Sequence, residues 1–300
     1  MSETSPIVRR PDAHATVTLG VSVQPWPEWV RSGAWRQSLD ASMPMLPVLA
    51  HEAIVVAANP EVTIAKLSHV VSQDPVLATR VVQLANAAYC APLQTVTTLS
   101  DAIVRMGTAA VRNLVIAVCL ASRGCDARIY GNNGRAQVDH AIGTAYMAHL
   151  IAGRVGWNHD EAFLAGLLHD IGKLLLLKLA HDWTHWHGLP VAPEDLADVL
   201  ATEHAATGAL LLRTSQFPRK LIETVLWHHD PQDAPNSLSE AEVIYLADRL
   251  SHRYGFGCEC DDTPIVDDVK CARLAINDEW LQDMDSRAPG LFVAATRALD

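Results

Sequence analysis

Apolar residues recur three and four positions apart along most of the chain after about residue 46, the spacing of a helix that buries one face. Asp74-Pro75 is a helix start, with Asp74 as N-cap and Pro75 in the first turn. A further helix is expected to begin at Ser100 and continue past Val118. Three apolar stripes at helical spacing belong, in order, to a helix before Asp74, to the helix after it and to the helix from Ser100: Ile64, Leu67, Val70, Val71; Leu77, Val81, Leu84, Ala88; and Ile103, Met106, Ala110, Leu114, Val118.

The second half of the chain repeats this pattern. It predicts a helix from about residue 138 to 153, one from about 160 to 179 interrupted near Gly172, and one ending near Arg213. After Pro218, apolar residues and His229 share one helical face. The Ser237-x-x-Glu240 capping box then predicts the start of a last helix.

Strands are not expected, because no alternating apolar and polar segment is followed by an Asn-Gly or Asp-Gly turn. The pattern therefore predicts an all-α fold of two packed helical lobes. We divide the chain into an extension (1–40), one domain (41–255) and a partly helical tail (256–300). The domain consists of a first lobe (41–121), a Gly/Asn-rich connector (122–137) and a second lobe (138–255).

Charge and composition narrow the classes of protein. The net charge of -11 over 300 residues gives no general attraction to nucleic acid, and no basic run supplies a local one. The N-terminus has no signal-peptide pattern, and no apolar stretch is long enough to span a membrane. We therefore expect a cytoplasmic protein that binds neither nucleic acid nor membrane. The six cysteines are scattered, and Cys258-x-Cys260 is too tight and too isolated for a zinc knuckle.

The distribution of histidines indicates that any chemical site lies in the second lobe, since eleven of the fourteen histidines lie at or after His140. Imidazole and carboxylate together form the ligand set of iron, manganese or zinc at hydrolytic centres. An aspartate next to a histidine can bridge two ions, so we expect one or two divalent ions. The candidate ligands, in order on successive predicted helices, are His140, His169, Asp170, His204, His228, His229 and Asp248.

Each candidate also has a structural interpretation. His140 alone resembles a satisfied core histidine, His204 a surface residue, and the His228-His229 pair a complement to a helix dipole. Asp248 has Arg249 or a histidine as an alternative partner. The ordered recurrence of all these positions favours a shared site.

A lysine and a second histidine cluster are less specific signs of a functional site. Lys173, just after the His169-Asp170 pair, is a candidate catalytic residue that would hold a phosphate or protonate a leaving oxygen, or else a solvated lysine. His181, His185 and His187 form a competing metal cluster, but tryptophans interleave with them, which favours an amphipathic surface.

The segment Leu168-His169-Asp170-Ile171-Gly172-Lys173 resembles the signature of the HD superfamily of metal-dependent phosphohydrolases, and the order of the candidate ligands is similar to that of its HD-GYP branch. Several motifs resemble the related HDOD family of bacterial signalling output domains over roughly residues 40–255. They are Leu46-Pro47, Asp74-Pro75-Val76-Leu77, Leu84-Ala85-Asn86-Ala87, Ala102-Ile103, Met106-Gly107, Glu203-His204-x3-Gly208 and His228-His229-Asp230-Pro231.

The resemblance implies an HD-type helical bundle in the second lobe and a regulatory or scaffolding role. Two departures count against hydrolysis of cyclic di-GMP. Residues 230–239 hold neither a Gly-Tyr-Pro loop nor a basic residue, and Ala136 stands where three-metal HD-GYP enzymes place a carboxylate.

Three functional hypotheses follow. The first is a bacterial signal-transduction output module that acts through a signalling protein partner and retains an HD-like metal site. The second is a metal-dependent phosphohydrolase whose ligand is a nucleotide or cyclic dinucleotide. The third is a metal- or oxygen-sensing helical domain. The first is favoured, and whether the protein is an enzyme stays open.

Overall fold

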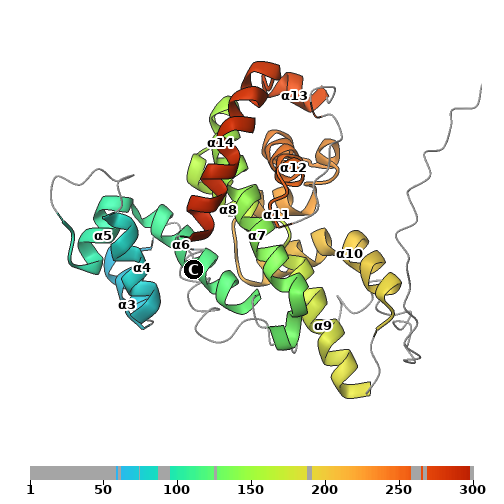
Figure 1. Cartoon of the computed structure of the whole chain (residues 1–300), viewed down its shortest axis with the longest axis horizontal. Helices are drawn as coiled ribbons and strands as arrows, with labels where there is room; N and C mark the ends of the chain where they lie inside the picture. The colour runs from blue at the N-terminus through green and yellow to red at the C-terminus, as the bar shows by residue number, and fades with distance from the viewer. Residues whose placement is uncertain are drawn as a thin grey trace, which may run out of the picture.

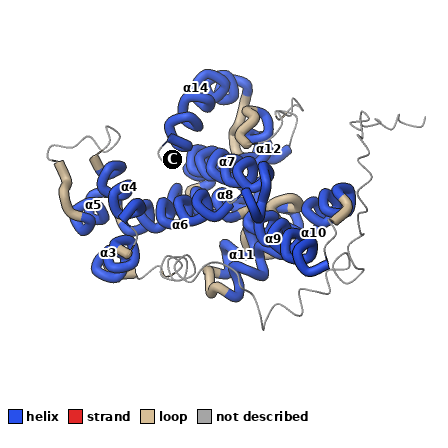
Figure 2. Tube along the Cα trace, turned by 60° about the horizontal axis from the view of Figure 1, so that its bottom comes forward, coloured by secondary structure: helices blue, strands red, loops and turns tan. Residues whose placement is uncertain are grey.

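The computed structural model describes residues 59, 62–73, 75–86, 95–124, 127–187, 191–257, 265 and 269–297. These residues form helices joined by short loops, and no β-strand is found among them (Figure 1; Figure 2). The predicted all-α fold is therefore confirmed. The expected extension at residues 1–40 and Cys258-x-Cys260 lie outside the described residues. No helix in the described part is long and apolar enough to cross a membrane.

The first lobe consists of α3 (Ile64–Ser72), α4 (Pro75–Ala85), α5 (Leu99–Met106) and α6 (Thr108–Gly124). Their apolar faces enclose a core of their own, as the spacing predicts, with Leu67, Val71, Val81 and Ile103 almost completely buried. The predicted helix start at Pro75 is confirmed. The side chain of Asp74, expected as its N-cap, lies outside the described residues.

The predicted single helix from Ser100 through Val118 is wrong, because the structure divides it at Gly107. This glycine has φ of 85°, a conformation that side-chain-bearing residues avoid, and it ends α5 before α6 begins. The helix also starts one residue earlier than expected, where the Thr98 side chain accepts a hydrogen bond from the Asp101 amide.

Asn86 fixes the end of α4 against a later part of the chain. Its side-chain amide donates to the carbonyl oxygen of Val96 at 2.7 Å, and its side-chain oxygen accepts from the Val96 amide at 2.8 Å. Arg105 donates to the carbonyl oxygen of Ala85. The Leu-Ala-Asn motif thus has a structural role in the first lobe.

The second lobe is built around the long helix α7 (Ala127–Ala152), which packs against α6, α8, α9 and α12. α6 contributes to both cores, with Leu114 and Val118 in the first and Ile116 and Ala117 in the second. The remaining helices of the lobe are α8 (His159–Leu168), α9 (Ile171–His187), α10 (Pro193–Thr214), α11 (Arg219–Leu226) and α12 (Leu238–Arg253).

The prediction that residues 122–137 form a connector between helices is wrong, because most of them are helical. α6 continues to Gly124 and α7 begins at Ala127, so most of this Gly/Asn-rich stretch is helical. A glycine in a helix costs only about 1 kcal/mol relative to alanine, whereas each added residue of an established helix gains a hydrogen bond. The packed part of α7 therefore extends through its unfavourable N-terminal sequence. The domain boundaries themselves stay predictions.

The end of α11 and the start of α12 also differ from the expectation. α11 ends at Leu226, so His229 lies beyond the helix rather than on its apolar face. α12 starts after Ser237 as predicted, but the capping box does not form. Ser237 is buried and its hydroxyl makes no hydrogen bond to the residues that the structure describes, while Glu240 pairs with Lys220.

The tail after residue 256 is partly helical and docks on the second lobe. It contains α13 (Val269–Arg273) and α14 (Asp278–Arg297), and α14 packs against α7. The ring of Phe292 stacks on that of Phe256 with centroids 4.2 Å apart. Arg253 and Tyr254 donate hydrogen bonds to Asp285. The core of the second lobe thus extends into this tail.

Candidate metal centre

The His169-Asp170 pair lies at the junction of two helices. α8 ends at Leu168 and α9 begins at Ile171, so the expected interruption falls at the pair itself rather than at Gly172. The side chain of Asn158 starts α8 by accepting hydrogen bonds from the amides of Asp160 and Glu161. Both junction residues are buried, which places their polar groups inside the second lobe.

Gly172 allows α9 to approach α10 with their backbones in contact. A Cβ at this position would lie 2.0 Å from the carbonyl oxygen of His204 and 2.8 Å from the Gly208 nitrogen. The approach brings His204 Nε2 to 3.2 Å from Asp170 Oδ1. The glycine of the His-Asp-Ile-Gly-Lys segment is therefore required by helix packing.

A first cluster of candidate ligands consists of His140, His169 and Asp248. Asp248 Oδ1, from α12, lies 2.9 Å from His140 Nε2, from α7, and 3.7 Å from His169 Nε2. Gly257 lets the chain after α12 lie against α7 at this point, since a Cβ added to it would lie 2.4 Å from the main-chain nitrogen of His140. The three side chains can each offer one atom to a shared ion.

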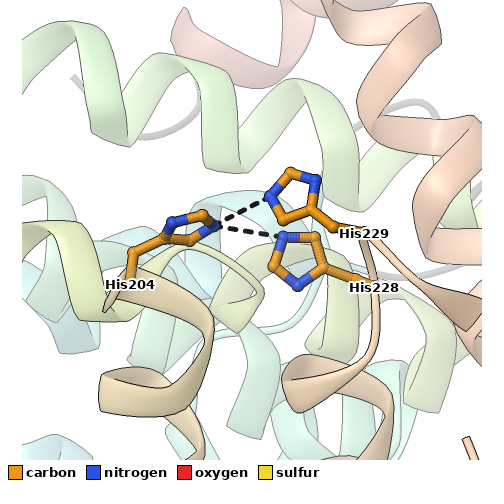
Figure 3. Close-up of side chains that lie close together, drawn as sticks. All are labelled: His204, His228 and His229. Carbon is orange, nitrogen blue, oxygen red and sulfur yellow. Dashed lines mark hydrogen bonds between the residues drawn. The ribbon is translucent and has the colours of Figure 1, made fainter. Parts of the chain in front are cut away.

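A second cluster consists of His204, His228 and His229 (Figure 3). The His204 ring comes from α10, and the other two from the chain directly after α11. His204 Nε2 lies 3.4 Å from His228 Nε2 and 2.9 Å from His229 Nε2. Ligand atoms about 2.1 Å from a tetrahedral ion lie about 3.4 Å from one another, so these separations suit such an ion.

Asp170 connects the two clusters through its two carboxylate oxygens. Oδ2 lies 3.4 Å from His169 Nε2 and 3.7 Å from His140 Nε2, whereas Oδ1 lies near His204 and at 3.9 Å from His228 Nε2. The structure thus brings together every candidate ligand expected from the sequence: His140, His169, Asp170, His204, His228, His229 and Asp248.

Three of the histidines are oriented by main-chain carbonyl groups. The Nδ1 atoms of His169, His204 and His228 each lie 2.7 Å from a carbonyl oxygen of the preceding turn. A carbonyl only accepts, so each Nδ1 carries a proton, and in the neutral ring the Nε2 lone pair points into the centre. This is the orientation found in histidines that bind metals.

These orientations test whether a metal fits the site. No proton is available between the Nε2 atoms of His204 and His228 when both rings are neutral, so two lone pairs face each other. Asp170 Oδ1, which is buried, also accepts no hydrogen bond from the described residues. A cation between these atoms would satisfy all of them, and the donor set therefore fits a divalent ion.

The two clusters differ in protonation. Burial opposes a charge on His169, but Asp170 and Asp248 outweigh it and raise the pKa of His169 to about 10. Burial lowers the pKa of His204 to about 4 and holds that of His228 well below its usual value. At neutral pH the second cluster is therefore ready to bind a cation, whereas a cation at the first must displace the proton of His169.

Both carboxylates stay ionised despite their burial. Burial would raise the pKa of Asp170, but His169 and Lys173 lower it well below its usual value. Hydrogen bonding from His140 and His169 outweighs the burial of Asp248 in the same way and lowers its pKa. The ammonium group of Lys173 pairs with Asp170 Oδ2, so the predicted catalytic lysine lies at the centre. Its catalytic role stays a prediction.

Sequence reasoning missed His252, which lies beside the first cluster. The signal was its position four residues after Asp248, on the same face of α12. The competing histidines on α9 form no metal-binding group among the residues described, where His181 is half-buried and His185 is exposed. The side chain of His187 is outside that part.

The fold and the site define a class: a two-lobed helical protein with a buried histidine–aspartate centre in its second lobe. Residues 43–231 match the profile of the HDOD domain. The chain belongs to the HDOD domain family. The match ends before α12, which carries Asp248, so this candidate ligand lies beyond the matched region.

Solved structures share the fold. An HDOD domain protein of unknown function from Geobacter sulfurreducens has a TM-score of 0.64 at 19% identity, covering 91% of this chain and 99% of that one. A protein from Shewanella amazonensis, described as a candidate metal-dependent phosphohydrolase, has a TM-score of 0.62 at 17% identity, covering 91% of this chain and 96% of that one. At these identities the likeness is one of fold.

Among curated proteins, the ribonuclease Y of Thermosipho melanesiensis is 32% identical over 122 residues, which are 41% of this chain and 19% of that protein. A protein of Treponema pallidum is 26% identical over 208 residues, which are 64% of this chain and 39% of that protein. The chain thus spans well under half the length of these two relatives.

Proposed function

We propose that this protein is a signal-transduction output module that acts through a protein partner and whose second lobe binds one or two divalent metal ions. One observation carries the metal-binding part: the neutral rings of His204 and His228 direct their Nε2 lone pairs at each other, beside Asp170 Oδ1, with no proton between the two nitrogens. Membership of the HDOD family supports the signalling part.

In this proposal His204, His228 and His229 would hold one ion, and His140, His169 and Asp248 a second, with Asp170 between them. Iron, manganese and zinc all suit imidazole and carboxylate ligands. The main-chain carbonyl groups of α8, α10 and α11 keep the Nδ1 protons in place, so the ligand atoms are oriented before an ion arrives.

A metal-dependent phosphohydrolase acting on a nucleotide is the second candidate. The observation that favours it is an accessible edge of the centre, where His229 is exposed and the side chains of Lys173 and Asp248 are 21% and 13% exposed. A bound divalent ion would polarise a phosphoryl oxygen or activate water. Lys173 would place its positive charge beside the same phosphoryl group.

Metal analysis combined with a hydrolysis assay distinguishes these candidates. The full chain is expressed with added manganese, iron or zinc, its metal content is measured, and hydrolysis of cyclic di-GMP and a generic phosphodiester is assayed. Asp170→Ala removes the carboxylate shared by both clusters. Asp182→Ala, which removes a surface carboxylate paired with Lys178 on α9, is the matched control.

The proposal expects metal in the wild-type protein and in Asp182→Ala, reduced metal in Asp170→Ala, and no turnover. Turnover that Asp170→Ala abolishes and Asp182→Ala retains would replace it with the second candidate. A wild-type protein that takes up no metal would refute both. The partner is sought by affinity purification from the source bacterium, and a metal-binding protein that acquires no specific partner there would contradict the signalling part.

A further inference from the structure

His252 lies on the solvent side of the first ligand cluster. It belongs to the last turn of α12, and its Nε2 atom is 3.6 Å from Asp248 Oδ1. Its ring centroid is 4.8 Å from that of His140. The side chain of His252 is 39% exposed, compared with 3% for His140. It therefore borders both the buried centre and the solvent.

Unlike the oriented histidines, His252 has no hydrogen bond to the described part of the chain. Its polar neighbour there is Asp248, and the 3.6 Å between His252 Nε2 and Asp248 Oδ1 is too long for a hydrogen bond. An imidazole ring carries at least one N–H group in either tautomer. His252 thus has a donor available for a ligand that reaches the edge of the centre.

The charge of the centre indicates which ligand this would be. Two divalent ions exceed the negative charge of Asp170 and Asp248, and the ammonium group of Lys173 adds to the excess. An oxyanion would balance it. A phosphate is better suited than a carboxylate, because its four oxygens can contact the ions and still leave one directed outward.

We propose that His252 donates a hydrogen bond to a phosphate group bound at the open edge of the metal centre. This proposal rests on the proposed metal binding and names the ligand class of the same site. His252 would select for a phosphate-bearing ligand and orient it, without itself holding an ion. A purely structural role of His252, complementing the C-terminal end of α12, would affect stability alone.

Phosphate titration of the full-length, metal-loaded protein tests the proposal. Binding of inorganic phosphate is measured by calorimetry, with acetate as the carboxylate comparison, and metal content is measured on the same samples. His252→Ala should weaken phosphate binding about 10-fold or more, the loss expected for one hydrogen bond to a charged group. His252→Gln, which keeps an N–H donor, should restore part of it.

His185→Ala is the matched control, because it removes an exposed histidine from α9. It should leave phosphate affinity unchanged, and all variants should keep the wild-type metal content. Equal phosphate affinity in the wild type and His252→Ala would overturn the proposal, as would metal loss in His252→Ala or acetate binding as tight as phosphate binding. A wild type that binds metal but no phosphate would overturn it and leave the metal proposal intact.

A wild type without metal would refute the proposed function and, with it, the role proposed for His252, because the charge that attracts the phosphate is that of the ions.

Discussion

The contact between α9 and α10 gives a prediction whose size can be worked out from the structure. In Gly172→Ala the new Cβ would lie 2.0 Å from the His204 carbonyl oxygen, whereas ordinary contacts begin near 3.4 Å. The two helices must therefore separate by about 1.4 Å, the difference between these distances. The obstacle is backbone, so a rotamer change cannot relieve it.

Overpacking of this kind costs up to about 3 kcal/mol, and alanine recovers about 1 kcal/mol of helix propensity relative to glycine. We therefore expect Gly172→Ala to lower the free energy of unfolding by about 2 kcal/mol. The same displacement moves His204 away from Asp170. Metal affinity should fall roughly 10- to 100-fold, as for other losses of ligand positioning.

The assay is urea unfolding of the metal-free protein together with a metal titration of the folded protein. Gly290→Ala is the matched control, because a Cβ added to this exposed helical glycine of α14 would meet nothing within 4 Å. It should stabilise the protein by roughly 0.5–1 kcal/mol and leave metal binding unchanged. A Gly172→Ala protein with unchanged stability and metal affinity would refute the packing argument.

Three further predictions follow from other parts of the structure. Gly257 has φ of 68°, and a Cβ added to it would lie 2.3 Å from a carbonyl oxygen of α7. Gly257→Ala should therefore destabilise the protein by at least about 1 kcal/mol in urea unfolding, and unchanged stability would contradict the contact. Phe292→Ala removes the stacked partner of Phe256 and should lower the melting temperature by several degrees, whereas Val293→Ala, at an exposed neighbour, should not. Burial lowers the pKa of His204 from 6.5 to about 4, so between these pH values the unfolded chain binds a proton at this residue that the folded protein does not. The stability of the metal-free protein should therefore fall as pH falls from 6.5 to 4. His204→Gln should flatten this part of the stability–pH curve, and an unchanged slope would count against the burial of a neutral ring.

The residue types and their order predicted which side chains come together at the candidate centre, because ionisable side chains are rarely buried without partners and their recurrence on apolar helices is informative. The sequence could not predict which of them lie close enough to share an ion. That depends on the α9–α10 contact at Gly172 and on the junction at His169-Asp170, both of which are tertiary features.

The errors in predicting the helix boundaries from the sequence have local causes. Gly107 interrupts an apolar pattern that continues unchanged on both sides, so periodicity alone does not show the break. The N-terminal turns of α7 contain residues that disfavour helices, but packing of the rest of α7 outweighs that preference. His252 was overlooked because a single exposed histidine carries no signal until Asp248 is known to face the centre.

The positions of the candidate ligands constrain when the centre can form during protein synthesis. The first lobe makes its core from residues 62–118, whereas the centre joins His140 to Asp248, which are 108 residues apart in the chain. Contacts between such distant residues form slowly and need the intervening chain to be complete. The first lobe can thus fold while the ribosome is still making the second, and the candidate metal centre can assemble only after α12 has emerged.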